Sequence, residues 1–179
     1  MQILIQGIGI VAMALYIFSF QFKTKKSILT VQLFSSMLFM VHFGLIGAIT
    51  GSILNGIGAL RALVISSRPK KWAMHKAWIP FFFVCYFASY ALTFLVFRRE
   101  PTVFNLLLEL LPVAGMIVTT FAFLSEKERG VRLLSLVNSP LWLTYNAVSG
   151  SIGGTLTESF SLVSILVAIF RFDIKKRGK

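Results

Sequence analysis

The sequence has few charged residues and a single cysteine. Of its 179 residues, 13% are charged and 56% are hydrophobic, whereas an ordinary soluble domain is roughly 25% charged. A soluble chain of this size needs more polar side chains on its surface, and the composition also excludes intrinsic disorder, collagen and coiled coil. Cys85 stands alone in an apolar run, so no internal disulfide or Cys-Xaa-Xaa-Cys metal site can form. We therefore expect an all-α, polytopic membrane protein with no metal or other cofactor.

Acidic residues are scarce as well. Eighteen Lys and Arg against six Asp and Glu give a formal net charge of +12, which in a soluble domain would suggest binding to phosphate groups. In this chain the basic residues form short clusters between long apolar runs, where such clusters more often set the orientation of a membrane protein. The charge therefore predicts association with the lipid bilayer and no nucleic-acid partner.

Seven apolar runs are close to the length of about 20 residues that a helix needs to cross the hydrocarbon layer. Together they leave only loops and a tail, with no room for a soluble domain. The first run lacks the basic segment and the cleavage site of a signal peptide, so we interpret it as a retained helix. The runs are Ile3–Phe22, Ile28–Ile49, Ser52–Ser67, Ala77–Phe97, Thr102–Leu124, Leu133–Ser149 and Ile152–Phe172.

The basic residues fall almost entirely on one side of the predicted bundle. Fifteen of the eighteen Lys and Arg lie in loops on the side of the C-terminus or in the tail itself. The exceptions are Arg98 and Arg99 in a loop on the other side and Arg61 within the third run. Because cytoplasmic loops have the excess of Lys and Arg, we predict an external N-terminus and a cytoplasmic C-terminus.

The sequence repeats at an offset of 103 residues, because residues 1–68 align with residues 104–171 without a gap. A lone helix between two three-helix units lets the second unit enter from the same side as the first. We therefore predict two parallel repeats, a symmetry known from secondary transporters. The predicted parts are a first repeat (1–68), a basic loop with a linker helix (69–101), a second repeat (102–172) and a basic tail (173–179). Matched positions include Gln6 and Glu109, Gly9 and Pro112, Asn55 and Glu158, and the segments GAITG and GSIGG.

This 3+1+3 arrangement resembles the SWEET and PQ-loop (MtN3-like) superfamily of small-solute carriers. The segment ELLPVAGMIVTTFAF in the fifth run and the string SGSIGGTLTES between the sixth and seventh runs are similar to bacterial inner-membrane proteins of the YgjV type. The resemblance implies a SWEET-like fold in the bacterial inner membrane, with a periplasmic N-terminus and a cytoplasmic C-terminus. It implies a transporter class and names no ligand.

Polar side chains occur inside the predicted helices, where an ionisable group costs several kcal/mol and is a functional candidate by default. Glu109 and Glu158 lie seven and six residues into their helices, roughly 9–11 Å below the outer boundary at a rise of 1.5 Å per residue. We expect the polar side chains of the outer half to converge on a site for substrate binding or coupling. These residues are Gln6, His42, Asn55, Glu109, Tyr145, Asn146 and Glu158.

The two carboxyl groups have two interpretations. A carboxyl in an apolar interior is more stable in its neutral form unless a cation is near, so Glu109 and Glu158 could accept protons and couple transport to a proton gradient, with His42 as a relay. Alternatively, each carboxyl is structural and hydrogen-bonded to a neighbouring polar group.

Arg61 also has two interpretations. It stands seven residues before Arg68, so its guanidinium could extend roughly 10 Å along the helix to the inner surface. Alternatively it faces inward, where it would neutralise Glu109 or Glu158 or bind an anionic part of a substrate. Spacing alone leaves both alternatives open.

The resemblance implies roles for two further residues. In the sugar carriers of the superfamily, an aromatic residue on the second helix of a repeat and an asparagine on the third line the substrate cavity. Trp142 and Asn55 match these positions, whereas their repeat partners Phe39 and Glu158 depart from the pattern. A glutamate at this place argues against a neutral sugar. The alternative for the aromatic helix face is packing in the core or at the lipid interface.

Helix-weakening residues occupy matched positions in the two repeats. Pro112 follows Glu109 by three residues, and Gly9 follows Gln6 by three. Both residues weaken a helix where a rocking carrier needs a hinge. The alternative is a static kink, because prolines in membrane helices often serve packing alone.

Two functions are compatible with the sequence. The first is a carrier that moves a small polar solute by rocking two three-helix bundles around a central site, and the second is a non-transporting scaffold or assembly protein with the same fold. We do not expect an enzyme, because the chain has no Ser-His-Asp set, HExxH motif or carboxylate-rich cluster. The spacings Gly47–Gly51 and Gly150–Gly154 predict tight turns, and they leave a homodimer open.

Overall fold

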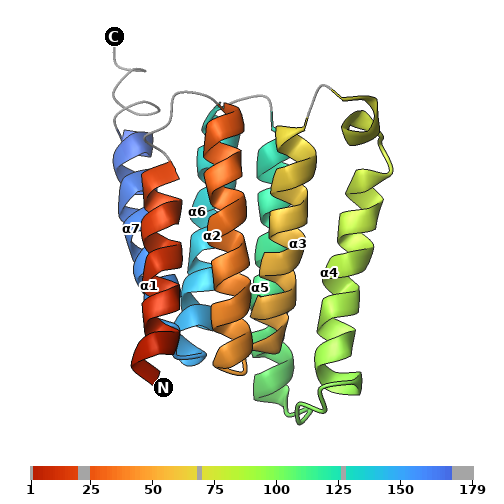
Figure 1. Cartoon of the computed structure of the whole chain (residues 1–179), viewed down its shortest axis with the longest axis vertical. Helices are drawn as coiled ribbons and strands as arrows, with labels where there is room; N and C mark the ends of the chain where they lie inside the picture. Colours follow the sequence, from red (N-terminus) through yellow and green to blue (C-terminus); the bar gives the residue numbers. More distant parts are fainter. Residues whose placement is uncertain (1, 20–24, 68–69, 126–127, 171–179) are drawn as a thin grey trace.

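The computed structural model describes residues 2–19, 25–67, 70–125 and 128–170, which Figure 1 shows as an all-helical bundle. Within these residues, seven long helices run alongside one another and a short 3-10 helix, η1, precedes the fourth. The elements are α1 (Gln2–Ser19), α2 (Lys25–Leu45), α3 (Ile49–Ser66), η1 (Lys71–Met74), α4 (Trp78–Leu95), α5 (Val103–Leu124), α6 (Glu128–Val148) and α7 (Ile152–Ala168). The predicted basic tail, 173–179, lies outside the described residues, as do Lys23, Arg68 and Lys127.

Each predicted membrane run falls on one of the seven long helices, so the all-α prediction is confirmed. Of the described helices, α1, α3, α4 and α5 have both the length and the apolar composition to cross a membrane. Shorter apolar helical stretches, Leu29–Leu45 and Ile152–Ala168, belong to α2 and α7. The bundle therefore has the composition of an integral membrane protein.

Several helix boundaries differ from the prediction by a few residues, and the ends of α2 and α6 show why. The predicted second run extends to Ile49, but α2 ends at Leu45 and Ile49 begins α3, because the chain reverses direction at Gly47. Helix α6 begins at Glu128 rather than at Leu133. Hydropathy marks only the apolar part of a helix, whereas α6 continues through the charged residues that precede it.

Two glycines form the turns between consecutive helices. Gly47, between α2 and α3, has φ 78°, and Gly150, between α6 and α7, has φ 72°, a region that a side chain disfavours. The two positions are 103 residues apart, the offset of the sequence repeat. Gly51 and Gly154, which we expected within the turns, instead lie in the first turns of α3 and α7. We call the end of the bundle with Gly47 and Gly150 the turn end and the opposite end the basic end.

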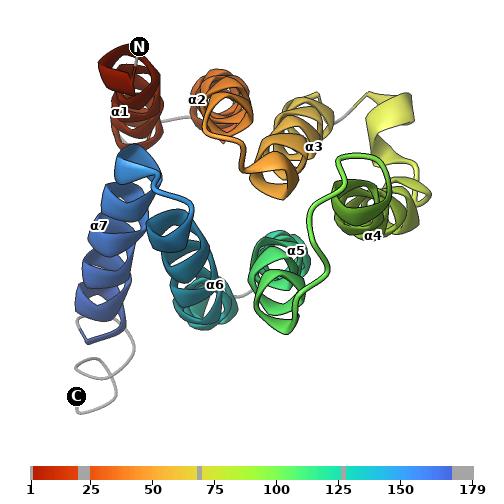
Figure 2. The ribbon, with the colours of Figure 1, turned by 90° about the horizontal axis from the view of Figure 1, so that it is seen from below.

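The long helices form two layers, which Figure 2 shows end-on. One layer contains α1, α2 and α3 in order, and the other contains α7, α6 and α5. The layers meet along two joints, where α1 packs against α7 and α3 packs against α5, and α4 packs against both α3 and α5 at one edge. A ring of six helices therefore surrounds the space between the layers.

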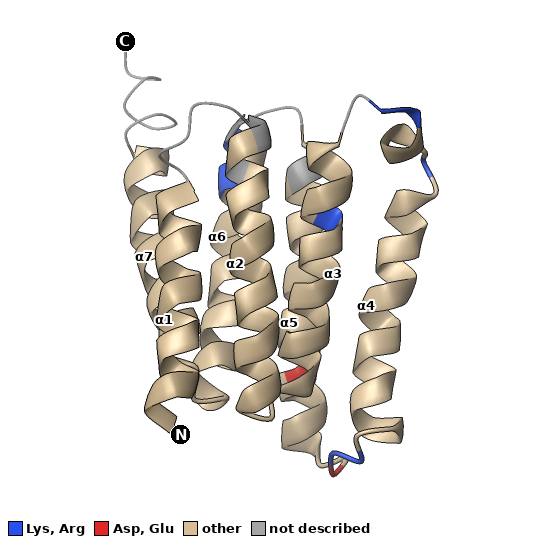
Figure 3. Cartoon of the chain, in the orientation of Figure 1, with Lys and Arg blue, Asp and Glu red and all other residues tan. Residues whose placement is uncertain are grey.

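Most of the charged residues drawn in Figure 3 lie toward the two ends of the bundle, whereas Arg61, Glu109 and Glu158 lie within α3, α5 and α7. Lys70, Lys71 and Lys76 lie at the basic end, beside η1. Large apolar side chains such as Val84, Phe87 and Val163 are exposed. A bundle with an apolar belt between charged ends matches the solvent profile of a lipid bilayer.

Candidate functional site

A cavity of about 160 Å³ lies between the two helix layers. Its walls come from six helices, α1, α2, α3, α5, α6 and α7, so neither layer forms it alone. Phe39, Phe43 and Tyr16 supply aromatic surface. The polar groups at the wall include Asn55, Arg61, Asn138, Asn146 and Glu158, together with the indole of Trp142. The central cavity thus combines apolar walls with a few polar groups, which is typical of small-molecule sites.

Two amide oxygens at this cavity have no hydrogen-bond partner. Among the described residues, the Oδ1 atoms of Asn138 and Asn146 are buried and unpartnered, and the Asn146 side chain is only 3% exposed. Both residues lie on α6, eight positions apart, on the helix face that also presents Trp142. An unsatisfied buried acceptor costs about 1–3 kcal/mol, so each oxygen destabilises this packing unless a hydrogen-bond donor reaches it.

Arg61 faces inward, and the alternative that it extends to the basic surface is wrong. The residue is 8% exposed. Its Nη1 donates to the hydroxyl of Tyr86 on α4 and to that of Thr120 on α5, each at 3.2 Å. The hydroxyls in turn lie 3.0 Å from each other. The guanidinium is therefore held in the bundle by a fixed pair of hydroxyls at the wall of the central cavity.

A second cavity of about 440 Å³ adjoins the first on the side of the basic end. The two cavities share wall residues from five helices, namely Tyr16, Gln32, Thr119, Asn138 and Glu158. Beyond them the second cavity is lined by residues nearer the basic ends of the helices, such as Val131 and Ser135 of α6 and Ser164 of α7. Glu158 therefore lies between the central cavity and a larger hollow toward the basic end.

At the turn end, by contrast, hydrogen bonds close the joint between α1 and α7. Gln6 on α1 donates from Nε2 to Gly150 O at 2.9 Å and accepts from Ile152 N at 3.2 Å. His42 on α2 lies 2.9 Å from Ile5 O through Nδ1 and 2.9 Å from the Ser151 hydroxyl through Nε2. Because a carbonyl only accepts, Nδ1 is the donor, so the ring links the two layers.

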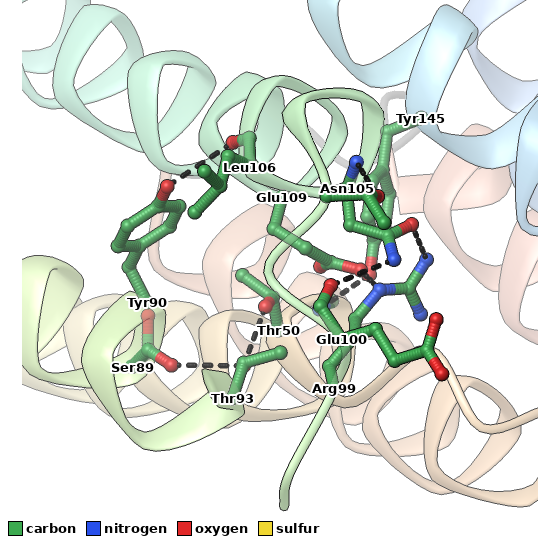
Figure 4. A network of polar contacts seen from close by, with 12 residues as sticks. Thr50, Ser89, Tyr90, Thr93, Arg99, Glu100, Asn105, Leu106, Glu109 and Tyr145 are labelled. Atoms are coloured by element: carbon green, nitrogen blue, oxygen red, sulfur yellow. Dashed lines mark hydrogen bonds and ion pairs between the residues drawn. The ribbon is translucent and has the colours of Figure 1, made fainter. Parts of the chain in front are cut away.

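A second set of polar contacts lies at the turn end, beside the joint between α3 and α5. The Tyr145 hydroxyl on α6 accepts from Gly51 N on α3 at 2.9 Å. Glu109 on α5, 1% exposed, pairs through Oε1 with Arg99 Nε at 2.9 Å. Figure 4 shows Tyr145, Glu109 and Arg99 close together, with Asn105 accepting a further hydrogen bond from Arg99. The partner of Glu109 is therefore Arg99, and not Arg61 as one of the sequence-based alternatives had it.

Helix α4 is tied to the same end. The hydroxyls of Thr50 on α3 and Thr93 on α4 lie 2.6 Å apart, and Tyr90 donates to Leu106 O of α5 at 3.2 Å (Figure 4). Thr102 caps the start of α5 by accepting from Asn105 N at 3.2 Å. The loop that contains Arg99 is thus anchored on both sides.

The structure divides the residues that we expected to converge into two groups. Asn55, Arg61, Trp142, Asn146 and Glu158 line the central cavity. Gln6, His42, Tyr145 and Glu109 form the contacts of the turn end instead. Sequence reasoning missed Arg99, which was counted only as a loop charge, and it missed Asn138 as a cavity residue with a free acceptor.

Gly9 lies where α1 and α7 cross. A side chain on Gly153 of α7 would collide with the backbone oxygen of Gly9, and one on Gly9 would meet the ring of His42 at 2.9 Å. The glycines are thus needed for close packing of the two helices. Pro112 is buried within α5, and the hinge role of Gly9 and Pro112 stays a prediction. Within the part of the chain that the structure describes, no group of three or more His, Cys, Asp or Glu could hold a metal ion.

Comparison with known proteins identifies the family. The sequence profile of the Imp-YgjV family, described as bacterial inner membrane protein, matches residues 3–176. The inner membrane protein YgjV of Escherichia coli (strain K12) is 29% identical over 182 residues, which cover 98% of this chain and 88% of that protein. No solved structure matches the chain. The chain belongs to the YgjV family of bacterial inner membrane proteins.

Proposed function

We propose that this protein is a carrier that moves a small polar solute across the inner membrane by alternating access. One observation supports this function above all others: a polar cavity between two helix layers is closed by hydrogen bonds at one end and continues into a larger hollow at the other. Such a cavity exposes its contents to one side of a membrane at a time. Relative movement of the two layers would exchange the open end for the closed one.

The packing of the helices supports two parallel three-helix repeats joined by α4 in a SWEET-like 3+1+3 arrangement. If the two repeats are equivalent, α1 corresponds to α5 and α3 corresponds to α7. The contact between α1 and α7 should then have a counterpart between α5 and α3, and both contacts are present. Residues 103 apart also have equivalent positions. His42 and Tyr145 each bond to the first residues of the helix across the joint, at Ser151 and Gly51. A two-fold axis along the membrane normal would relate the repeats.

All seven long helices cross the membrane in this proposal, with a periplasmic N-terminus and a cytoplasmic C-terminus. The support is the charge at the basic end and the alternation of helix direction along the chain. The structure then corresponds to a state open toward the cytoplasm, in which the turn-end contacts form the periplasmic seal. Glu158, which lines both cavities, is the better candidate for proton coupling, because Glu109 is held by Arg99 at the seal.

The test is ligand binding followed by transport. The thermal unfolding midpoint of the detergent-purified protein is measured against sugars, amino acids, vitamins and nucleosides, and any solute that raises it is followed by counterflow in liposomes. A ligand that binds only the folded protein raises the midpoint with concentration.

We expect at least one class to raise the midpoint and to exchange across the membrane, with both effects weakened in Glu158→Gln. The matched control is Glu100→Gln, an exposed glutamate in the α4–α5 loop. If no class binds and no solute exchanges, the non-transporting scaffold replaces the carrier.

A further inference from the structure

We propose that residues 70–78, at the basic end beside α4, bind the headgroup of an anionic phospholipid of the surrounding membrane. We call these residues the η1 segment. The inference is independent of the carrier function, because it requires only that α4 crosses the membrane, for which α4 has the length and the apolar composition. The observations are the charge of the segment, its exposed aromatic and apolar side chains, and the contacts that fix its shape.

The η1 segment has positive charge and no acidic residue near it in the sequence. Lys70, Lys71 and Lys76 are all exposed. The first acidic residue of the chain is Glu100, which follows α4 and lies at the turn end. Among the described residues, the three lysines form no ion pair. Their ammonium groups are therefore available to an external anion.

His75 adds a hydrogen-bond donor to these charges. Its Nδ1 accepts from Ala77 N at 3.2 Å, so the hydrogen of the neutral imidazole is on Nε2. The residue is exposed and stands next to Lys76 in the chain. The oxygens of a phosphodiester only accept hydrogen bonds, and bonds to an ionised acceptor are the stronger kind. The polar groups of the segment thus suit a phosphate rather than a cation.

Two large side chains of η1 favour an anion that is attached to a lipid. Trp72 is 47% exposed and Met74 is 60% exposed. Tryptophan rings concentrate at the headgroup level of membranes, and an exposed apolar side chain gains free energy when it leaves water. A soluble anion would leave both side chains in water, whereas a phospholipid covers them with the upper part of its acyl chains.

Packing holds η1 against the start of α4. Ala73 is fully buried, and Trp78 Nε1 donates to Trp72 O at 2.9 Å. The rings of Trp72 and Trp78 meet edge-on at a centroid distance of 6.1 Å, and Trp78 stacks on Phe82 at 5.7 Å. The backbone between the lysines therefore has a fixed shape, so that binding requires little ordering of the chain.

The segment also lies at the depth of the headgroups. Trp78 is the first residue of α4, and Lys76 precedes it by two positions, so the positive charge ends where the apolar helix begins. Helix α4 packs against α3 and α5 at one edge of the bundle (Figure 2), and Figure 3 shows the blue basic residues at this edge. A lipid can therefore approach the η1 segment from the side of the bundle.

The experiment measures which lipid lies beside the segment. The full-length protein is reconstituted into vesicles with equal amounts of phosphatidylglycerol, which is anionic, and phosphatidylcholine, which is zwitterionic, in both leaflets. One preparation contains phosphatidylglycerol brominated in the upper part of its acyl chains, and the other contains phosphatidylcholine brominated in the same way. Bromine quenches indole fluorescence at short range, and Trp72 is the most exposed tryptophan of the chain.

We expect the affinity for phosphatidylglycerol to exceed that for phosphatidylcholine about fivefold or more, because one Lys near an anionic surface contributes roughly this factor. Replacing the three lysines together (Lys70→Gln, Lys71→Gln and Lys76→Gln) should abolish the preference, and replacing all three by Arg should preserve it. The matched control is Arg129→Gln, on an exposed residue at the start of α6, which should leave the preference unchanged. All these residues are exposed, so the unfolding midpoint in neutral detergent should stay level and verify folding.

Four outcomes would overturn the inference. The first two are equal quenching by the two lipids in the wild type and a Gln variant that keeps the preference. The third is a loss in Arg129→Gln as large as in the Gln variant, which would show that net charge acts without a defined site. The fourth is displacement of phosphatidylglycerol by glycerol phosphate, which would show a site for a soluble anion. None of these results bears on the carrier, which solute exchange tests separately.

Discussion

The two ends of the bundle differ in how the helix layers meet. At the turn end, side chains of α1, α2 and α6 bond across the joints to the starts of α3 and α7, and Glu109 of α5 pairs with Arg99 of the α4–α5 loop beside them. Toward the basic end lies a cavity of about 440 Å³, whose lining combines serines and apolar side chains with the polar groups of Gln32, Asn138 and Glu158. Among the residues that the structure describes, one end is therefore sealed by specific contacts, and the other contains the larger cavity.

The strength of the seal fits a conformational switch. A hydrogen bond contributes roughly 0.5–1.5 kcal/mol net, so the four bonds between the layers, at Gln6, His42 and Tyr145, together amount to roughly 2–6 kcal/mol. Moving a two-state equilibrium from 1:99 to 99:1 takes about 5.5 kcal/mol. In the proposed carrier, contacts of this total strength would hold the turn end closed and would still allow ligand binding to open it.

The largest expected effect comes from breaking the ion pair of the seal. Arg99→Ala leaves the Glu109 carboxylate, 1% exposed, without its cation. We expect the free energy of unfolding to fall by about 3 kcal/mol. This value is at the lower end of the range for buried ion pairs, because the Arg99 side chain is 32% exposed. The measurement is equilibrium unfolding in detergent.

Two controls accompany this variant. Arg98→Ala removes a neighbouring charge that is exposed and is expected to leave the stability unchanged. Arg99→Ala combined with Glu109→Gln removes both charges and is expected to recover most of the loss. Equal stability of Arg99→Ala and the wild type would show that the pair does not hold the turn end.

A smaller effect is expected at the other joint. Gln6→Ala removes two hydrogen bonds to the α6–α7 turn, at Gly150 and Ile152. Because the Gln6 side chain is partly exposed, we expect the free energy of unfolding to fall by only about 1 kcal/mol. The same unfolding experiment measures this change. Gln2→Ala, on an exposed residue of the same helix, serves as the control, and a matching loss in that variant would refute a specific role for Gln6.

The smallest effect on stability is expected from filling the hollow end. Ser135→Leu places an apolar side chain in the second cavity, and we expect the free energy of unfolding to change by less than about 0.5 kcal/mol. Solute exchange in liposomes should nevertheless slow at least tenfold, because the path toward the basic end is blocked. The control is Val137→Leu, which adds a methylene on the exposed side of α6 and should leave the rate of solute exchange unchanged. If Ser135→Leu also leaves this rate unchanged, the second cavity is not part of the solute pathway.

Hydropathy and charge predicted the seven helices because an apolar run of nearly 20 residues is a strong and local signal. The repeat offset of 103 pairs Gly47 with Gly150, so the correspondence of these two turns was readable from the sequence. Helix ends were less predictable, as α6 shows, because charged residues continue a helix beyond its apolar part.

The partners of the buried groups could not be predicted, since they depend on how the layers are packed. Arg99 was assigned to a loop, yet the loop folds back onto α5 and brings its guanidinium to Glu109. Arg61 was correctly considered as inward-facing, but its hydroxyl partners, Tyr86 and Thr120, come from helices whose contact with α3 no spacing reveals. Long-range contacts of this kind are fixed by tertiary structure alone.

The most direct test of alternating access is the side from which the cavity can be reached. Thr119 lines both cavities, so Thr119→Cys in a Cys85→Ala background provides one reactive thiol for a membrane-impermeant maleimide, applied to sealed vesicles of either orientation. We predict labelling at least tenfold faster from the side of the basic end, and faster labelling from the turn end once Gln6→Ala and Tyr145→Phe weaken both joints. Equal labelling from the two sides, or a turn-end rate that the two substitutions leave unchanged, would contradict the account.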